Sequence, residues 1–152
     1  MKKIIFSFMA VLTLACGFTA CGSDGGDENI NYSTTPEQAT AGTYSGTWTR
    51  TLDGNDETFS GTVTLASAGK TGVTTVTFSC PETSLEATSV ANVWNSKYDF
   101  QFMNQTASAD NGLGVAFSGR ISEAGVLNTS FTITQRVGRK AYEYKYSFTG
   151  SK

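Results

Sequence analysis

From residue 42 to the C-terminus, apolar and polar residues alternate in short runs, which is the pattern of β-strands with one buried face. The alternation is clearest in the last run, where Tyr142, Tyr144, Tyr146 and Phe148 alternate with polar residues. Threonine, valine and aromatic residues are frequent in the runs, and turn-forming glycine, asparagine and aspartate separate them. This part of the chain therefore predicts an all-β meander.

The runs predict eight strands, at residues 43–52, 58–67, 72–80, 84–94, 97–103, 114–121, 126–137 and 139–149. Consecutive antiparallel strands with one buried face leave two exposed edges unless the sheet closes on itself. We therefore expect an eight-stranded antiparallel up-and-down β-barrel, and a β-sandwich is the alternative that such strands also suit. Eight strands enclose an interior that is filled by side chains or holds one small ligand.

The first 41 residues lack this alternation. Two lysines precede an apolar run at residues 4–14, which is too short for a transmembrane helix, since such a helix needs about 20 residues. A positive start, an apolar core and a small residue before the cleavage point are the parts of an export signal. We therefore assign residues 1–20 to a signal peptide, 21–41 to a flexible acidic tether with one short turn after Pro36, and 42–152 to the folded domain.

The sequence Phe18-Thr19-Ala20-Cys21 resembles the lipobox of bacterial lipoproteins. The resemblance implies a diacylglycerol on the Cys21 sulfur and an acyl chain on its amino group, and two such groups anchor a protein stably. Cys16 also follows an alanine and is the alternative, but Cys21 leaves a signal of usual length and precedes a polar spacer. We expect Cys21 to anchor the protein in the outer membrane. The acidic spacer resembles the signal that sends some Gram-negative lipoproteins to the cell surface.

Charge and cysteine content exclude several classes of function. From residue 42 onward nine basic residues balance nine acidic ones, and nucleic-acid binding would require a strong basic excess. The basic cluster Arg136, Arg139 and Lys140 is expected to decorate a hairpin end. The chain has no histidine, and Cys80 is the one thiol that remains after the signal and the anchor. An intramolecular disulfide, a Cys/His zinc site and a histidine-dependent triad are thereby excluded, and Cys80 is expected to be buried.

The first strand contains Gly46-Thr47-Trp48, which resembles the Gly-x-Trp motif at the start of calycin and lipocalin-like domains. Together with eight predicted strands, this motif makes the domain similar to the calycin-like lipoproteins of bacteria. The resemblance implies a barrel with a pocket for a small apolar molecule and no cofactor. It also implies that Trp48 seals one end, with a basic residue of the last strands, Arg136 or Lys145, packed on it.

Inward aromatic residues of such a barrel would line its pocket, and we expect a ligand to contact Trp48, Phe78, Phe100, Phe117, Tyr142, Tyr144 and Tyr146. No catalytic constellation is predicted, because no spacing forces a pair of carboxylates together. The acidic residues Asp53, Asp56 and Glu57 offer oxygen ligands to calcium, but a solvated hairpin turn explains them better, and no metal site is predicted. The prediction is a lipid-anchored binding module and not an enzyme.

Two further functions remain open from the sequence. The first possibility is that aromatic residues form a platform that stacks on a surface glycan, although their strict alternation favours a buried core; these residues are Trp48, Trp94, Tyr142, Tyr144 and Tyr146. Alternatively, the loops could contact another envelope protein or inhibit it, and the longest of them is the polar stretch at residues 104–112.

Overall fold

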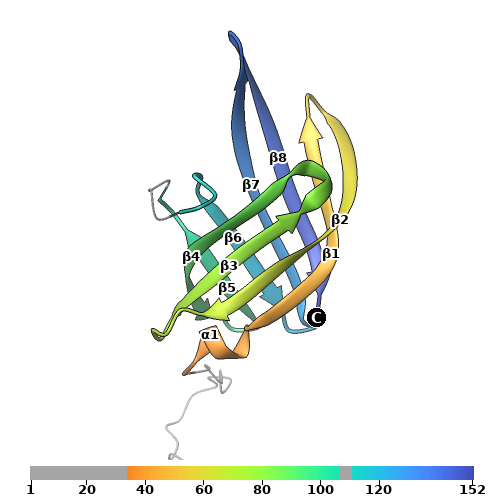
Figure 1. Cartoon of the computed structure of the whole chain (residues 1–152). Coiled ribbons are helices and arrows are strands. Elements are labelled where there is room, and N and C mark those ends of the chain that lie inside the picture. The colour runs from red at the N-terminus through yellow and green to blue at the C-terminus, as the bar shows by residue number, and fades with distance from the viewer. Residues whose placement is uncertain (1–33, 107–110) are drawn as a thin grey trace, which may run out of the picture. The chain divides into compact units, whose positions relative to one another are not determined.

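The computed structural model describes residues 34–106 and 111–152, whose strands form a closed barrel in sequence order (Figure 1). Every neighbouring pair of strands is antiparallel, and β8 pairs with β1. The predicted up-and-down barrel is therefore confirmed, and the sandwich alternative is wrong. The strands are β1 (Gly42–Leu52), β2 (Asn55–Ser67), β3 (Val73–Cys80), β4 (Leu85–Asn95), β5 (Asp99–Asn104), β6 (Phe117–Ser122), β7 (Val126–Val137) and β8 (Lys140–Ser151).

Aromatic side chains pack together around Trp48 at the end of the barrel where β3 ends and β6 begins. This residue is fully buried, and its indole Nε1–H donates a hydrogen bond to the Ser79 carbonyl oxygen at 3.0 Å. Its ring contacts four others, at centroid distances of 5.0–6.2 Å, from Phe78, Phe131, Tyr146 and Phe148. A Cβ at Gly61 would lie 2.5 Å from Trp48 Cδ1, so a glycine is needed there for the indole to fit. Cys80 is fully buried in the same core, as predicted.

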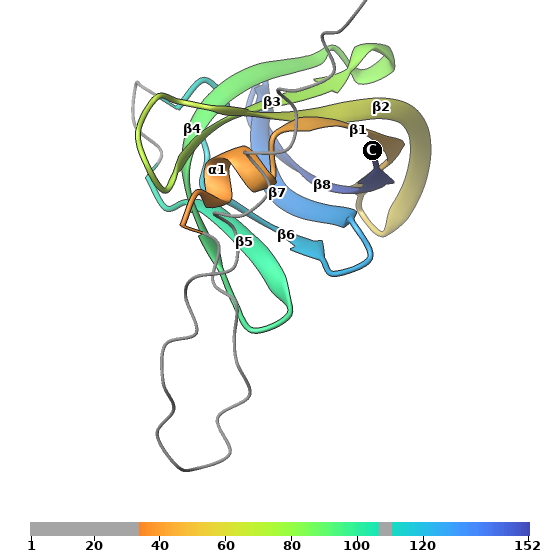
Figure 2. The ribbon, with the colours of Figure 1, turned by 90° about the horizontal axis from the view of Figure 1, so that it is seen from below.

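One end of the barrel is covered by the short helix α1 (Pro36–Ala39), which lies across that end in the view from below (Figure 2). The buried Glu37 carboxylate accepts a hydrogen bond from the Gly72 amide at 2.9 Å. On the other side, the Tyr44 hydroxyl donates to the Thr40 carbonyl oxygen at 2.9 Å. Residues 36–40, which fall in the segment predicted to be a tether, are thus bonded to the barrel. Cys21 and the predicted signal peptide lie outside the described residues.

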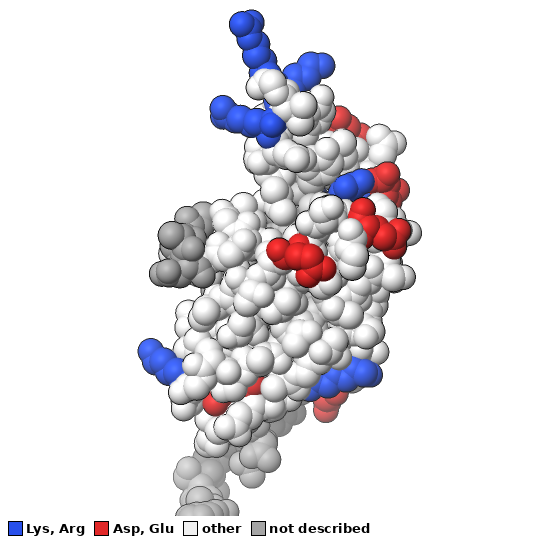
Figure 3. All heavy atoms as spheres, in the orientation of Figure 1, with Lys and Arg blue, Asp and Glu red and all other residues white. Residues whose placement is uncertain are grey.

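At the opposite end, the hairpins β1–β2 and β7–β8 extend beyond the other strands (Figure 1). β2 pairs with β3 only from Thr62 onward, and β7 pairs with β6 only as far as Ser130. The tip of the β7–β8 hairpin carries exposed basic residues, and Figure 3 shows them gathered at that end. These residues, Arg136, Arg139 and Lys140, decorate a hairpin end as expected.

Arg50 joins the two long hairpins. Its Nη2 lies 2.5 Å from Glu57 Oε2, and its guanidinium carbon lies 5.3 Å from the ring centroid of Phe59 and 5.5 Å from that of Tyr144. The hydrogen bond with Glu57 raises the pKa of Arg50 above its ordinary value.

The expectation that Arg136 or Lys145 packs on Trp48 is wrong. Lys145 is exposed and lies opposite Thr51 on the outward face, because its neighbours in β8 point inward. Arg136 lies opposite Ala141 near the hairpin tip.

Candidate functional site

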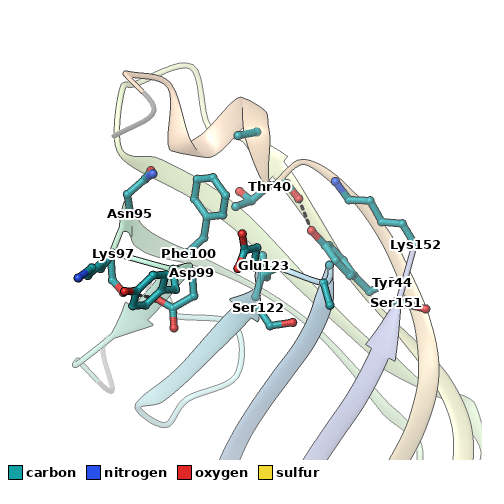
Figure 4. A pocket seen from close by; sticks show the side chains of 16 residues that line it. Thr40, Tyr44, Asn95, Lys97, Asp99, Phe100, Ser122, Glu123, Ser151 and Lys152 are labelled. Carbon is teal, nitrogen blue, oxygen red and sulfur yellow. Dashed lines mark hydrogen bonds between the residues drawn. The ribbon is translucent and has the colours of Figure 1, made fainter. Parts of the chain in front are cut away.

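A cavity of about 530 Å³ lies at the end of the barrel that α1 covers (Figure 4). Its walls come from α1, the start of β1, the β4–β5 connection, the β6–β7 turn and the C-terminus. A volume of this size lies within the range of sites for small molecules. The cavity is therefore the candidate binding site of the barrel.

One side of the cavity is apolar. Phe100 in β5 lies opposite Ile121 in β6, and Figure 4 shows the Phe100 ring directed toward α1. Tyr44 adds its ring from β1, and both Tyr44 and Ile121 are buried. Because these side chains alternate with outward residues of the same strands, their position follows from the pleat. They can cover the apolar part of a ligand.

The most informative polar group of the cavity is Asn95, the last residue of β4. Its register partner is Phe100, so the amide lies beside the apolar wall. The side-chain oxygen Oδ1 is buried and has no hydrogen-bond partner among the described residues. A buried acceptor without a donor costs about 1–3 kcal/mol, and native proteins rarely leave one unpaired. Asn95 therefore combines a place in the cavity wall with a buried acceptor whose hydrogen bond is not met by any described residue.

Charged groups near the cavity are either paired or at its rim. The Asp99 carboxylate pairs with Arg120 and accepts a hydrogen bond from the Ser96 hydroxyl. The Lys152 ammonium lies 5.1 Å from the ring centroid of Tyr44. Burial raises the pKa of Tyr44 to about 12, so its phenol is neutral at pH 7. Lys97, Glu123 and Lys152 also line the cavity, but all three are exposed and lie at its rim. The buried part of the lining therefore suits a neutral group better than an ion.

The seven aromatic residues predicted to contact a ligand lie in three places. Phe100 lines the cavity. Tyr142 and Tyr144 are half-buried on the long β7–β8 hairpin, with Arg50 over Tyr144. The other four are buried in the core of the barrel, where the centroids of Phe78 and Phe117, for example, are 5.0 Å apart; these four are Trp48, Phe78, Phe117 and Tyr146.

Sequence reasoning missed Asn95, Ile121 and Lys152 as cavity residues. A signal for Asn95 was present, because it follows the buried residues Ala91 and Val93 at the same period of two. A polar residue at an inward position is a candidate for ligand contact. No pattern in the sequence marks Lys152.

Two carboxylates near the turn between β1 and β2 interact with other side chains of the protein. Glu57 pairs with Arg50, and the Thr51 hydroxyl donates to Asp56 at 2.6 Å. Over residues 34–106 and 111–152, no group of three or more histidine, cysteine, aspartate or glutamate side chains is placed to hold a metal ion. The described helices include none that is both long and apolar enough to cross a membrane.

The long loop at residues 104–112 lies partly outside the described residues. Its far end is held by the buried Asn111, whose Nδ2 donates to the carbonyl oxygens of Thr106 and Val115. Asn111 Oδ1 also accepts a 2.5 Å hydrogen bond from the Ser89 hydroxyl.

Comparison of the chain with protein-family models, with curated proteins and with solved structures finds no match. The barrel and its cavity are therefore the basis on which a function can be inferred.

Proposed function

We propose that this protein is a lipid-anchored binding module of the bacterial envelope, whose barrel holds a small, largely apolar ligand in the cavity next to α1. The observation that carries the proposal concerns Asn95 Oδ1, which is buried beside a cavity of about 530 Å³ and has no hydrogen-bond partner in the part of the chain that the structure describes. Apolar protein side chains filling this space would leave the acceptor without a hydrogen bond, whereas a ligand that donates a hydrogen bond would satisfy it.

The lining defines the chemistry of the ligand. Phe100, Ile121 and the Tyr44 ring would cover an apolar body, and Asn95 would accept a hydrogen bond from one N–H or O–H group. An ionised ligand would lose hydration without a counter-ion in the interior, so the polar group should be neutral. The function is binding without a chemical step.

Residues around Cys21 support the anchor. The lipobox resemblance at residues 18–21 and the polar residues after Cys21 favour acylation at that position in the outer membrane. The Gly46-Thr47-Trp48 motif and the eight-stranded barrel are also consistent with a calycin-like lipoprotein.

The anchor is tested by growing the bacterium with labelled palmitate and comparing two single variants. Cys21→Ala should abolish labelling of the protein, and Cys16→Ala should leave it unchanged. Labelling that survives in Cys21→Ala would refute the assignment of the lipid to this cysteine.

Ligand binding is tested by native mass spectrometry of the protein purified from its own host. We expect a population with an added small-molecule mass that organic extraction removes. Asn95→Leu should lose the added mass, because the ligand then loses its acceptor, whereas Asn92→Leu on the exposed face of the same strand should keep it. An unmodified mass for the wild-type protein, with no stabilisation by extracted host lipids, would refute the proposal.

A further inference from the structure

The outer wall of the barrel has a groove that is separate from the α1-end cavity. A hollow of about 510 Å³ crosses the outward side of β4, β5, β6, β7 and β8. A second hollow of about 510 Å³ adjoins it over β4 and β5, and Trp94 and Met103 line both. No residue that lines either hollow lines the cavity. We call the two hollows together the outer groove.

A cross-strand row of five side chains runs along the outer groove. Trp94 lies opposite Gln101, which lies opposite Arg120. Arg120 lies opposite Asn128, and Asn128 lies opposite Thr149. Neighbouring residues of these strands are buried in the core, so the row faces outward. Since adjacent strands are about 4.8 Å apart, the row is about 19 Å long.

The next row of outward residues explains why the wall is hollowed. It contains three serines, of which Ser118 lies opposite Ser130, and Ser130 lies opposite Ser147. Small side chains beside the long ones of the first row leave an open floor. The register of the sheet therefore produces a groove that runs across the strands.

The groups along the outer groove can form hydrogen bonds but carry little net charge. Asn128 Oδ1 accepts from the Thr149 hydroxyl at 2.8 Å, which leaves the amide N–H groups of Asn128 to a ligand. Gln101 forms no side-chain hydrogen bond with any residue that the structure describes. Arg120 pairs with Asp99, so its charge is balanced. The half-buried Trp94 ring supplies a flat apolar surface at one end.

We propose that the outer groove binds a neutral oligosaccharide, with one sugar ring stacked on Trp94 and further hydroxyl groups bonded to Gln101 and Asn128. A sugar chain combines apolar ring faces with many uncharged donors and acceptors, which matches this row of side chains. An anionic polymer would require unpaired cations, and the one cation of the row is paired with Asp99. This activity adds to the binding of a small ligand inside the barrel and does not depend on it.

The test titrates the purified full-length protein with cellohexaose, xylohexaose and maltohexaose and follows tryptophan emission and heat of binding. Trp48 is fully buried, so a change in emission on binding reports on Trp94. We expect one of these hexasaccharides to bind. Trp94→Ala should weaken its binding at least tenfold. Asn128→Ala should weaken it about fivefold, which corresponds to one hydrogen bond of about 1 kcal/mol.

Asn55→Ala at the start of β2 is the matched control for Asn128→Ala, because both asparagines are exposed and Asn55 is outside the outer groove. It should leave the affinity unchanged. Asn128 is exposed, so its variant tests the proposal even if Trp94→Ala lowers the stability of the barrel.

The proposal is overturned if none of the three hexasaccharides binds at millimolar concentration, or if a bound one is insensitive to both groove variants. Loss of the extractable small molecule in Asn95→Leu, with hexasaccharide binding retained, would separate the two sites.

Discussion

Replacing Asn95 by leucine tests the cavity in the ligand-free protein. The substitution removes the buried Oδ1 that has no partner among the described residues and puts methyl groups of similar size beside Phe100. An unpaired buried acceptor costs about 1–3 kcal/mol, whereas an apolar group of the same shape carries no such penalty. We therefore expect the free energy of unfolding to rise by about 1–3 kcal/mol.

The assay is urea unfolding of refolded, ligand-free protein, followed by tryptophan fluorescence. The midpoint should rise while the slope with urea stays constant, because the surface exposed on unfolding changes little. For a domain of this size the melting temperature should rise by roughly 3–5 °C per kcal/mol. Asn92→Leu, an exposed asparagine of the same strand, is the control and should change the stability by less than about 0.5 kcal/mol.

With saturating ligand, the wild-type protein should become more stable than Asn95→Leu. A ligand that binds only the folded state stabilises it in proportion to the logarithm of its concentration over its Kd. The wild-type protein keeps the acceptor and should gain more than Asn95→Leu. A leucine variant that is less stable than the ligand-free wild type by about 1 kcal/mol or more would show that Oδ1 already has a partner, and the reasoning would fail.

Three further predictions concern the ends and the packing of the barrel. Glu37→Ala should lower the free energy of unfolding by about 1.5–3 kcal/mol in urea titrations and speed hydrogen exchange at Gly72, because a charged acceptor of that amide is lost; unchanged exchange at Gly72 would contradict this. Gly119→Ala should cost about 1–3 kcal/mol or more by the same assay, since its Cβ would lie 2.0 Å from Phe102 Cζ, and a variant as stable as the wild type would show that the ring moves freely. The pKa of Tyr44 is raised in the folded state to about 12 from 10.0, so the stability that its neutral phenol contributes is complete below pH 10 and is lost as the pH rises toward 12. Melting curves of Tyr44→Phe should therefore show a smaller loss of stability over that range than those of the wild type. An equal loss of stability would refute the assignment.

The strands could be predicted because one face of each is buried, but the residues at which they begin were harder to predict. The predicted start of β2 at residue 58 is three residues late, since Asp53 and Gly54 adopt positive φ and reverse the chain in two residues. The predicted start of β5 is early, because the Ser96 amide bonds to the Asp99 carbonyl oxygen at 2.7 Å and closes a turn. The predicted start of β6 at residue 114 is early for a similar reason, as the preceding residues bond to the side chain of Asn111.

The position of the cavity was not predictable from periodicity. Alternation correctly directs Trp48 and Phe78 inward, but it does not say whether their rings meet. In the structure the ring centroids lie 6.2 Å apart and the two rings fill the end of the barrel opposite α1. The cavity instead forms where residues distant in sequence, such as Thr40, Asn95 and Lys152, come together when the sheet closes. The outer groove likewise depends on the register between strands, which fixes which side chains are neighbours across them.

The first and last strands lie side by side, since Ser45 pairs with Ser151, and a Cβ on Gly42 would lie 2.8 Å from Lys152 Cε. The two ends of the barrel domain could therefore be joined by a short linker and new ends opened at Gly138, an exposed turn residue. Such a circular permutant would keep all eight strand pairings, with the former terminal pair now joined as a hairpin. The closed sheet itself therefore has no first strand. The order of the strands along the chain alone decides which two of them carry the termini.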